Sequence, residues 1–173
     1  MEKARVKIED AVTKWKRSNN GLIRIHIEGK ESIQVNSFIQ QRAASTIKLL
    51  LAIEAFRQID EGILTLTSVI QRTEKNTVGG AGVLGALPRL THIKVEELLT
   101  LMIIVSDNTA TNELISLVGF EKINECARNL GLKKTVLNRY IMSSIKEKLT
   151  FTNNKCLSSQ ILARPLFAVL DLC

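Results

Sequence analysis

The sequence predicts an α+β fold that is mostly helical and has one β-hairpin near the N-terminus. Apolar and polar residues alternate over 22–36, whereas apolar residues recur at helical spacing over most of the remaining chain. Of the 173 residues, 45% are hydrophobic and 24% are charged, a balance that buries a core and excludes intrinsic disorder or a collagen-like structure. The length fits one compact domain or part of a larger one.

The N-terminal region predicts a helix followed by the hairpin. Charged and apolar residues over 4–17 are spaced as in an amphipathic helix, which Ser18-Asn19-Asn20-Gly21 ends. Residues 22–27 and 32–36 are the alternating strands, with a turn at 28–31. A two-stranded hairpin is marginally stable alone, and the sequence offers no convincing third strand. Either helices cover the hairpin, or the rest of its sheet is missing.

The remaining chain predicts further helices separated by one long loop. The helix at 43–59 is strongly apolar and ends before Gly62, and the helix at 95–105 is apolar around most of its circumference, which predicts burial on nearly all sides. The glycine-rich segment 76–88 between them is expected to be a loop. The last three predicted helices cover residues 109–118, 120–130 and 158–170, although Pro165 opposes the last of them.

Charge and cysteine content exclude several classes of partner and cofactor. The net charge of +7 is dispersed along the chain without interleaved aromatic residues, which argues against nucleic-acid binding. The longest near-apolar run, residues 98–105, is far shorter than the roughly 20 residues needed to cross a bilayer. The three cysteines include no C-x-x-C pair, so we expect no metal, cofactor or disulfide framework. Residues 1–17 lack a secretory signal, which predicts a cytoplasmic location, or a secreted or periplasmic one if a leader is removed.

Ser45 and Lys48 form the first candidate for chemistry, at the start of the helix predicted over 43–59. Their spacing of three places them on one helical face, so the amine can reach the hydroxyl. A lysine whose pKa is lowered by burial can accept the proton of a serine nucleophile. Because one such pair is expected by chance in a chain of this composition, the pair alone is better explained as two helix-surface residues.

The tripeptide Ser106-Asp107-Asn108 is the second candidate, and it is rare by chance at this composition. It follows directly after the apolar run 98–105 and interrupts two predicted helices, so a rigid element would hold its polar side chains. The alternative is structural, because Ser106 or Asp107 could simply cap the next helix.

Together these residues resemble the class A β-lactamases and, more broadly, the penicillin-recognising serine hydrolases, which combine S-x-x-K with S-D-N. The matching segments are Ala43-Ala44-Ser45-Thr46-Ile47-Lys48, residues 79–87 and residues 97–112, and the resemblance continues to about residue 140 through Leu137-Asn138-Arg139. It implies a β-lactamase-like α+β fold in which the hairpin belongs to an antiparallel sheet that is incomplete in this chain.

The resemblance also implies roles for individual residues. Ser45 would open a β-lactam ring to form an acyl-enzyme, with its backbone N–H in the oxyanion hole, and Lys48 would act in the proton relay. Ser106 would give a proton to the departing lactam nitrogen, and Asn108 would bind the side-chain amide of the substrate. His26 and His92 match no catalytic position and are expected in a strand and a loop, respectively.

The chain departs from the family in two places. The glutamate that activates the deacylating water in class A enzymes, two residues after the equivalent of Arg139, is Ile141 here, and Glu147 is the only carboxylate between residues 141 and 160. Either Glu147 substitutes for that base or deacylation lacks one. The Lys-Thr-Gly motif of the family is absent, so we expect residues 1–173 to be one β-lactamase-like domain that is incomplete at its C-terminal end, truncated or frame-shifted.

Three functions remain open at this point. The leading hypothesis is a β-lactamase-type hydrolase of β-lactams or related small molecules, as in antibiotic resistance or β-lactam catabolism. The second is a penicillin-binding or sensor module with a stable acyl-enzyme. The third is an inactive fragment whose exposed sheet edge drives homo-oligomerisation.

Overall fold

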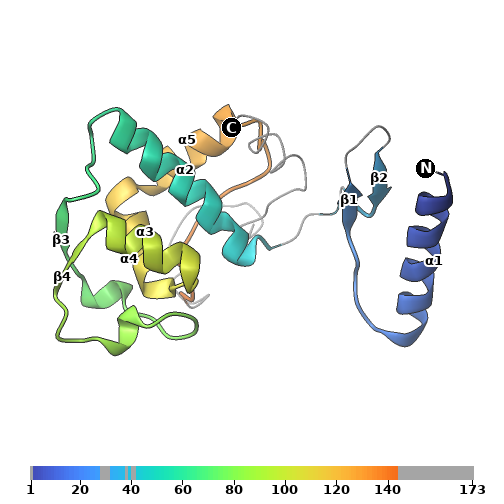
Figure 1. The fold of residues 1–173 in the computed structure, drawn as a ribbon, viewed down its shortest axis with the longest axis horizontal. Coiled ribbons are helices and arrows are strands. Elements are labelled where there is room, and N and C mark those ends of the chain that lie inside the picture. Colours follow the sequence, from blue (N-terminus) through green and yellow to red (C-terminus); the bar gives the residue numbers. More distant parts are fainter. Residues whose placement is uncertain (1, 28–31, 38, 40–41, 144–173) are drawn as a thin grey trace, which may run out of the picture. The chain divides into compact units, whose positions relative to one another are not determined.

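The computed structural model describes residues 2–27, 32–37, 39 and 42–143 (Figure 1). They belong to two compact units, one formed by the described residues up to 39 and the other by residues 42–143, and each unit is considered by itself. The helix predicted at 158–170, Glu147, Cys156 and Cys173 lie outside the described residues. Within the described part of the chain, no helix combines the length and apolar character needed to cross a membrane.

The N-terminal unit contains the predicted helix and hairpin. Helix α1 spans Glu2–Ser18, and strands β1 (Ile25–Ile27) and β2 (Ile33–Val35) pair antiparallel, with Ile25 opposite Val35. The Asn36 side chain donates a hydrogen bond of 2.9 Å to the Ile23 carbonyl and ties the end of β2 back to the segment before β1. The sequence predictions for this region are therefore confirmed, with strands shorter than the alternating segments.

The larger unit is built around helix α2, which packs against three other helices (Figure 1). A short 3-10 helix, η1 (Ala44–Thr46), leads directly into α2 (Ile47–Asp60). Helices α3 (Val95–Ile104), α4 (Asn108–Val118) and α5 (Phe120–Asn129) surround it. The buried apolar residues of these helices form one core that includes Ile47, Leu51, Leu98, Met102, Leu114, Ile115 and Ile123. The helices predicted over 43–130 are confirmed.

The sequence prediction that strands end with the hairpin is wrong, because the larger unit has a second sheet. Strands β3 (Val69–Gln71) and β4 (His92–Lys94) pair antiparallel, with Ile70 opposite Ile93. Each has only three residues, too few to show an alternating pattern. His92 therefore lies in a strand, not in the predicted loop. The 3-10 turns η2 (Glu74–Asn76) and η3 (Leu84–Ala86) interrupt the segment between the two strands.

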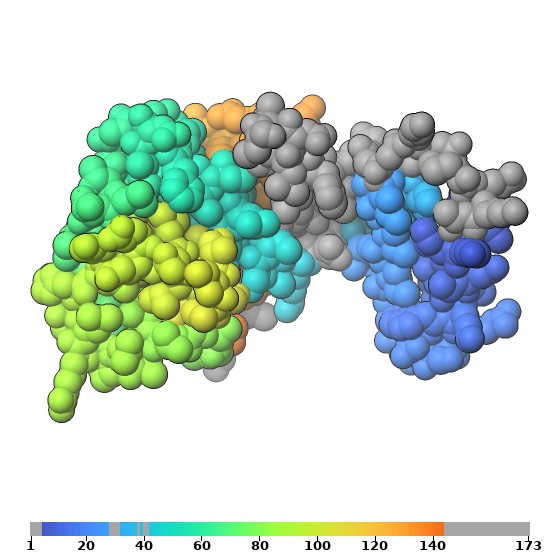
Figure 2. Space-filling model, in the orientation of Figure 1, coloured from blue at the N-terminus to red at the C-terminus, as the bar shows by residue number. Residues whose placement is uncertain are grey.

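The prediction that the helix at 95–105 is buried on nearly all sides is also wrong. Leu98, Leu99 and Met102 face the core, but Ile103 and Ile104 are 48% and 75% exposed. In Figure 2 the yellow-green atoms of α3 lie at the surface of the unit. An apolar sequence shows which residues can be buried, but it does not show how many sides of a helix have a neighbour.

An ion pair between a buried carboxylate and a partly exposed arginine lies in the C-terminal half of α2. The Glu54 side chain is fully buried and accepts hydrogen bonds of 2.7 Å from both Nε and Nη2 of Arg57, and one of 2.8 Å from Gln58. Hydrogen bonding from Arg57, followed by that from Gln58, outweighs burial and holds the pKa of the Glu54 carboxyl below its usual value of 4.5. The charge of Glu54 therefore depends on Arg57.

Replacing Arg57 with alanine should lower the free energy of unfolding at pH 7 by about 1 to 3 kcal/mol, because a buried carboxylate loses its charged partner. A carboxyl with a lowered pKa stabilises the fold above its usual pKa, and this contribution is lost as the pH falls through the folded-state value. The difference between wild type and Arg57→Ala should therefore shrink below pH 4.5. Urea unfolding of wild type and Arg57→Ala at pH 7 and at a pH below 4.5 measures this difference in the free energy of unfolding. Arg5→Ala, which removes an exposed pair with Glu9, should change stability by less than about 1 kcal/mol.

Candidate active site

Ser45 is presented to solvent at the start of the helical segment that becomes α2. It lies in the middle of η1, between the left-handed Ala44 (φ +47°) and Thr46, and it is exposed. Lys48 follows in the first turn of α2 and is buried, with 3% of its surface exposed. The predicted pair is thus an accessible hydroxyl followed by a buried amine, as a nucleophile and its base require.

Lys48 is connected to Ser45 through Ser106. The Lys48 Nζ donates to the Ser106 carbonyl at 2.6 Å, the Ser106 Oγ at 2.9 Å and the Asn108 Oδ1 at 3.1 Å. The Ser106 hydroxyl in turn donates to the Ser45 Oγ at 3.1 Å. Among the described residues no hydrogen bond joins Lys48 directly to Ser45, so the expected direct contact is replaced by a chain of two hydrogen bonds.

Two opposing effects act on the pKa of the Lys48 amine. Burial lowers the pKa of its amine from 10.5, and the negative charge of Asp107 opposes that shift. Three acceptors match the three donors of the ammonium. A neutral amine would have a lone pair toward one of these oxygens, and it would then accept a proton from the Ser106 hydroxyl. The site can therefore store a proton and release it.

Asp107 has the structural role that the sequence left open for this tripeptide. Its buried carboxylate caps α4 by accepting from the Ala110 N–H at 2.9 Å. The neighbouring Ser106 and Asn108 point to Lys48 instead. The tripeptide therefore combines a helix cap with two contacts to the amine, and the two interpretations from the sequence are both needed.

The segment 78–84 lies against the same tripeptide. The Asn108 N–H donates to the Ala81 carbonyl at 3.0 Å, and its side-chain amide donates to the Gly79 carbonyl at 3.2 Å. Sequence reasoning predicted a loop here and included residues 79–87 in the family resemblance, but it predicted no contact for this segment. The repeated glycines at 79, 80 and 82 were the available signal, because glycine marks close approach of the backbone.

Ile141, at the position where a deacylating base was expected, is held by its backbone. Asn112 on α4 accepts from the Ile141 N–H at 2.8 Å and donates to its carbonyl at 3.2 Å. Asn112 is 1% exposed, and sequence reasoning missed it because nothing local distinguishes a buried asparagine in a helix. Glu147, the alternative base, lies outside the described residues.

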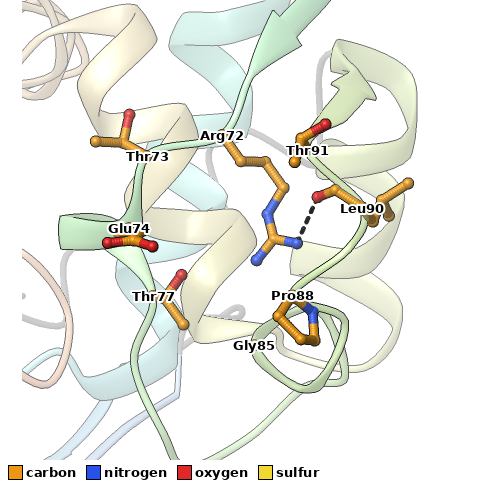
Figure 3. A pocket seen from close by; sticks show the side chains of 8 residues that line it. All are labelled: Arg72, Thr73, Glu74, Thr77, Gly85, Pro88, Leu90 and Thr91. Atoms are coloured by element: carbon orange, nitrogen blue, oxygen red, sulfur yellow. Dashed lines mark hydrogen bonds between the residues drawn. The ribbon is translucent and has the colours of Figure 1, made fainter.

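A cavity of about 420 Å³ lies elsewhere in this unit, between the β3–η2 segment and the η3–β4 segment (Figure 3). The Arg72 side chain extends between these two walls and donates to the carbonyls of Leu87 and Leu90 at 2.7 and 2.8 Å. None of Ser45, Lys48, Ser106 or Asn108 lines it. Hydrogen bonding and burial, not concavity, therefore distinguish the candidate cluster.

Comparison with known proteins identifies the family of this chain. The sequence model of the beta-lactamase enzyme family matches residues 3–171. The chain belongs to this beta-lactamase family. No curated protein matches it significantly.

Several solved structures are similar to this member of the beta-lactamase family. A beta-lactamase from Sphaerobacter thermophilus is 38% identical, with a TM-score of 0.61 over 64% of this chain and 42% of its own. A mutant of PBP-A, in an acyl-enzyme complex with penicillin G, is 29% identical, with a TM-score of 0.69 over 82% and 54%. The chain thus spans about half the length of the solved structures it matches, and the predicted β-lactamase-like α+β fold is confirmed.

Proposed function

We propose that this protein reacts with β-lactams by forming an acyl-enzyme at Ser45. The observation that supports this most directly is the hydrogen-bonded chain from Ser45 through Ser106 to the buried Lys48. Such a chain joins a solvent-accessible nucleophile to a base whose pKa is lowered by burial. The similar solved structures include a beta-lactamase and a PBP-A mutant that was captured with penicillin G.

In the proposed reaction, neutral Lys48 begins the step. The Ser45 Oγ attacks the lactam carbonyl carbon while its proton passes to Ser106, and Ser106 passes its own proton to the Lys48 amine. When the carbon–nitrogen bond breaks, the proton returns from Lys48 through Ser106 to the lactam nitrogen. The net result adds Ser45 O–H across that bond, so the entire substrate mass stays on the enzyme. No histidine is required.

Two further groups complete the proposed site. Ser45 lies in the first turn of a helical segment, where backbone N–H groups have no intrahelical acceptor, so its N–H is suited to bind the developing oxyanion. Asn108 is proposed to bind the side-chain amide of the substrate. Its Oδ1 accepts from Lys48 and its NH₂ group donates one hydrogen to the Gly79 carbonyl, which fixes the orientation of the amide, and the NH₂ group has a second hydrogen for the substrate.

A stable acyl-enzyme, as in a penicillin-binding module, is the second candidate, and Ile141 favours it. Its side chain has no proton-accepting atom, and Asn112 holds its backbone in place. Hydrolysis of the acyl-enzyme requires a base that activates water. We therefore propose fast acylation and slow release, which makes the protein a poor β-lactamase and a good penicillin-binding protein.

Intact-mass spectrometry with penicillin G tests this proposal. The chain should gain the mass of one whole penicillin molecule, because ring opening has no leaving group, and the adduct should persist after removal of free penicillin. Ser45→Ala should show no adduct. Ser68→Ala, at a serine whose hydroxyl bonds to Thr65 on the surface, should react as wild type does. An unchanged mass of the wild-type chain would refute acylation at Ser45.

A further inference from the structure

The Asp107 carboxylate binds segment 78–84, next to the candidate site, by accepting hydrogen bonds from two consecutive backbone amides. Its Oδ2 accepts from the Val83 N–H at 2.6 Å and from the Leu84 N–H at 2.7 Å, while its Oδ1 caps α4 through Ala110. All three donors are backbone groups, and Asp107 is 1% exposed. This carboxylate therefore joins segment 78–84 to the start of α4.

Gly82 is the residue that lets the two segments come so close. Its φ is +106°, and a Cβ built on it would lie 2.5 Å from the Asp107 Cα and even closer to the carboxyl group. Contacts under 3.0 Å are essentially never found for a real Cβ, and backbone atoms cannot turn away as a flexible side chain can. Any other residue at 82 must move Asp107 or the segment itself.

Asp107 lies between the two residues that bind Lys48. Ser106 supplies its carbonyl and hydroxyl oxygens, and Asn108 supplies its Oδ1. Ser106 has a φ of +54°, a left-handed conformation that a serine adopts only when its surroundings impose it. A shift of Asp107 therefore moves all three contacts of the amine.

We propose that Gly82 is a positioning residue of this site: the space it leaves allows Val83 and Leu84 to hold Asp107, and Asp107 fixes the turn around Lys48. The effect on catalysis rests on the proposed acylation of Ser45, whereas the effect on Lys48 does not. Gly82 touches neither substrate nor the reacting atoms. It acts through the backbone amides of the next two residues.

The test compares Gly82→Ala with alanine substitutions at two other glycines whose φ is positive. Gly62 and Gly131 have φ of +73° and +75°, and a Cβ on either meets nothing within 4 Å. Gly62→Ala and Gly131→Ala therefore carry the backbone strain without the clash. Hydrogen exchange at the Val83 and Leu84 amides measures the stability of their hydrogen bonds to Asp107. The rate of penicillin G adduct formation measures acylation. Carbon NMR of the Lys48 side chain gives the pKa of its amine, which reports on the surrounding turn. Lys48→Arg identifies the Lys48 signal, because that signal is missing from the variant.

Gly82→Ala should speed exchange of both amides at least tenfold and slow acylation at least tenfold, while both controls stay within twofold of wild type. The Lys48 titration should move, because burial lowers the pKa of this amine and the charge of Asp107 raises it, and both effects depend on the turn that Asp107 holds. A purely structural role would lower stability without moving that titration. Unchanged amide exchange, an acylation rate within twofold of wild type, or an equal loss in the controls would each overturn the proposal.

The outcome is also decisive if the wild-type chain does not acylate. In that case the proposed function fails, but the Lys48 titration is still measurable in wild type and in Gly82→Ala. A titration that moves would support the positioning role of Gly82, and one that does not move would overturn it.

Discussion

Replacing Lys48 with arginine is expected to slow acylation of Ser45 by about two to four orders of magnitude, the contribution of a positioned general base. Arginine keeps the positive charge and donates to the same oxygens, but it does not lose its proton in proteins. The variant would therefore preserve the charge around Ser106 while it removes the acceptor for the Ser45 proton. Stopped-flow or quenched mass measurement of the penicillin G adduct gives the rate.

The pH dependence separates this role from a structural one. In wild type the neutral amine is the active form, so the acylation rate should rise with pH through the pKa of Lys48 and level off above it. Burial lowers that pKa below 10.5, so the midpoint of the rise should lie below this pH. In Lys48→Arg the rise should be absent.

Two further variants guard against misfolding as the explanation. Lys48→Met removes the charge from a nearly fully buried site and should also be inactive, with thermal stability at least equal to that of the arginine variant. Lys122→Arg, at an exposed lysine paired with Glu125 on α5, should acylate as wild type does. Acylation of Lys48→Arg at a third of the wild-type rate or more would show that Lys48 is not the base.

The sequence allowed prediction of the parts of the site that depend on local spacing. Ser45 and Lys48 lie one helical turn apart in any helix, and Ser106 and Asn108 follow an apolar helix that must end near them. Lys48 contacts Ser106 and Asn108, which lie 58 and 60 residues further along the sequence. These contacts were predicted only through the family resemblance. Local periodicity contains no information on such distant contacts.

The parts that escaped prediction depend on contacts between distant segments. Strands β3 and β4 are too short to produce a pattern, and they exist because they pair with each other. Asn112 and Ile141, which are hydrogen-bonded, are 29 residues apart in the sequence. Asp107 and Val83, which are also hydrogen-bonded, are 24 residues apart. In each case an ordinary polar residue gains its role from a neighbour that only the fold supplies.

The exposure of α3 also depends on contacts that the sequence does not show. The sequence of α3 is apolar around most of its circumference, yet its contacts with α2 and α4 bury only part of it. Ile103, Ile104 and Val105 stay exposed directly before Ser106. The apolar pattern therefore located the helix correctly and overestimated its burial.

Replacing Ile141 with glutamate is expected to shorten the lifetime of the acyl-enzyme by about two to four orders of magnitude, because it introduces a carboxylate that can activate water. Asn112 binds the backbone N–H and carbonyl of residue 141, so the new side chain starts from a fixed position. The next residue, Met142, lies 3.8 Å from a Cβ built on Gly80, and the same Cβ would be 2.8 Å from the Asn108 amide. The segment of Ile141 thus lies beside the part of the site that Asn108 forms.

The matched control for this variant is Ile141→Gln, which has the same size and no basic group. Penicillin G adducts of wild type and Ile141→Gln should persist, whereas the Ile141→Glu adduct should decay with release of the opened penicillin, faster as rising pH ionises the glutamate. Adding Asn112→Ala to Ile141→Glu should remove most of the gain, because the backbone of residue 141 would no longer be held. Equal adduct lifetimes for Ile141→Glu and Ile141→Gln would mean that residue 141 does not face the acyl group, and that slow release has another cause.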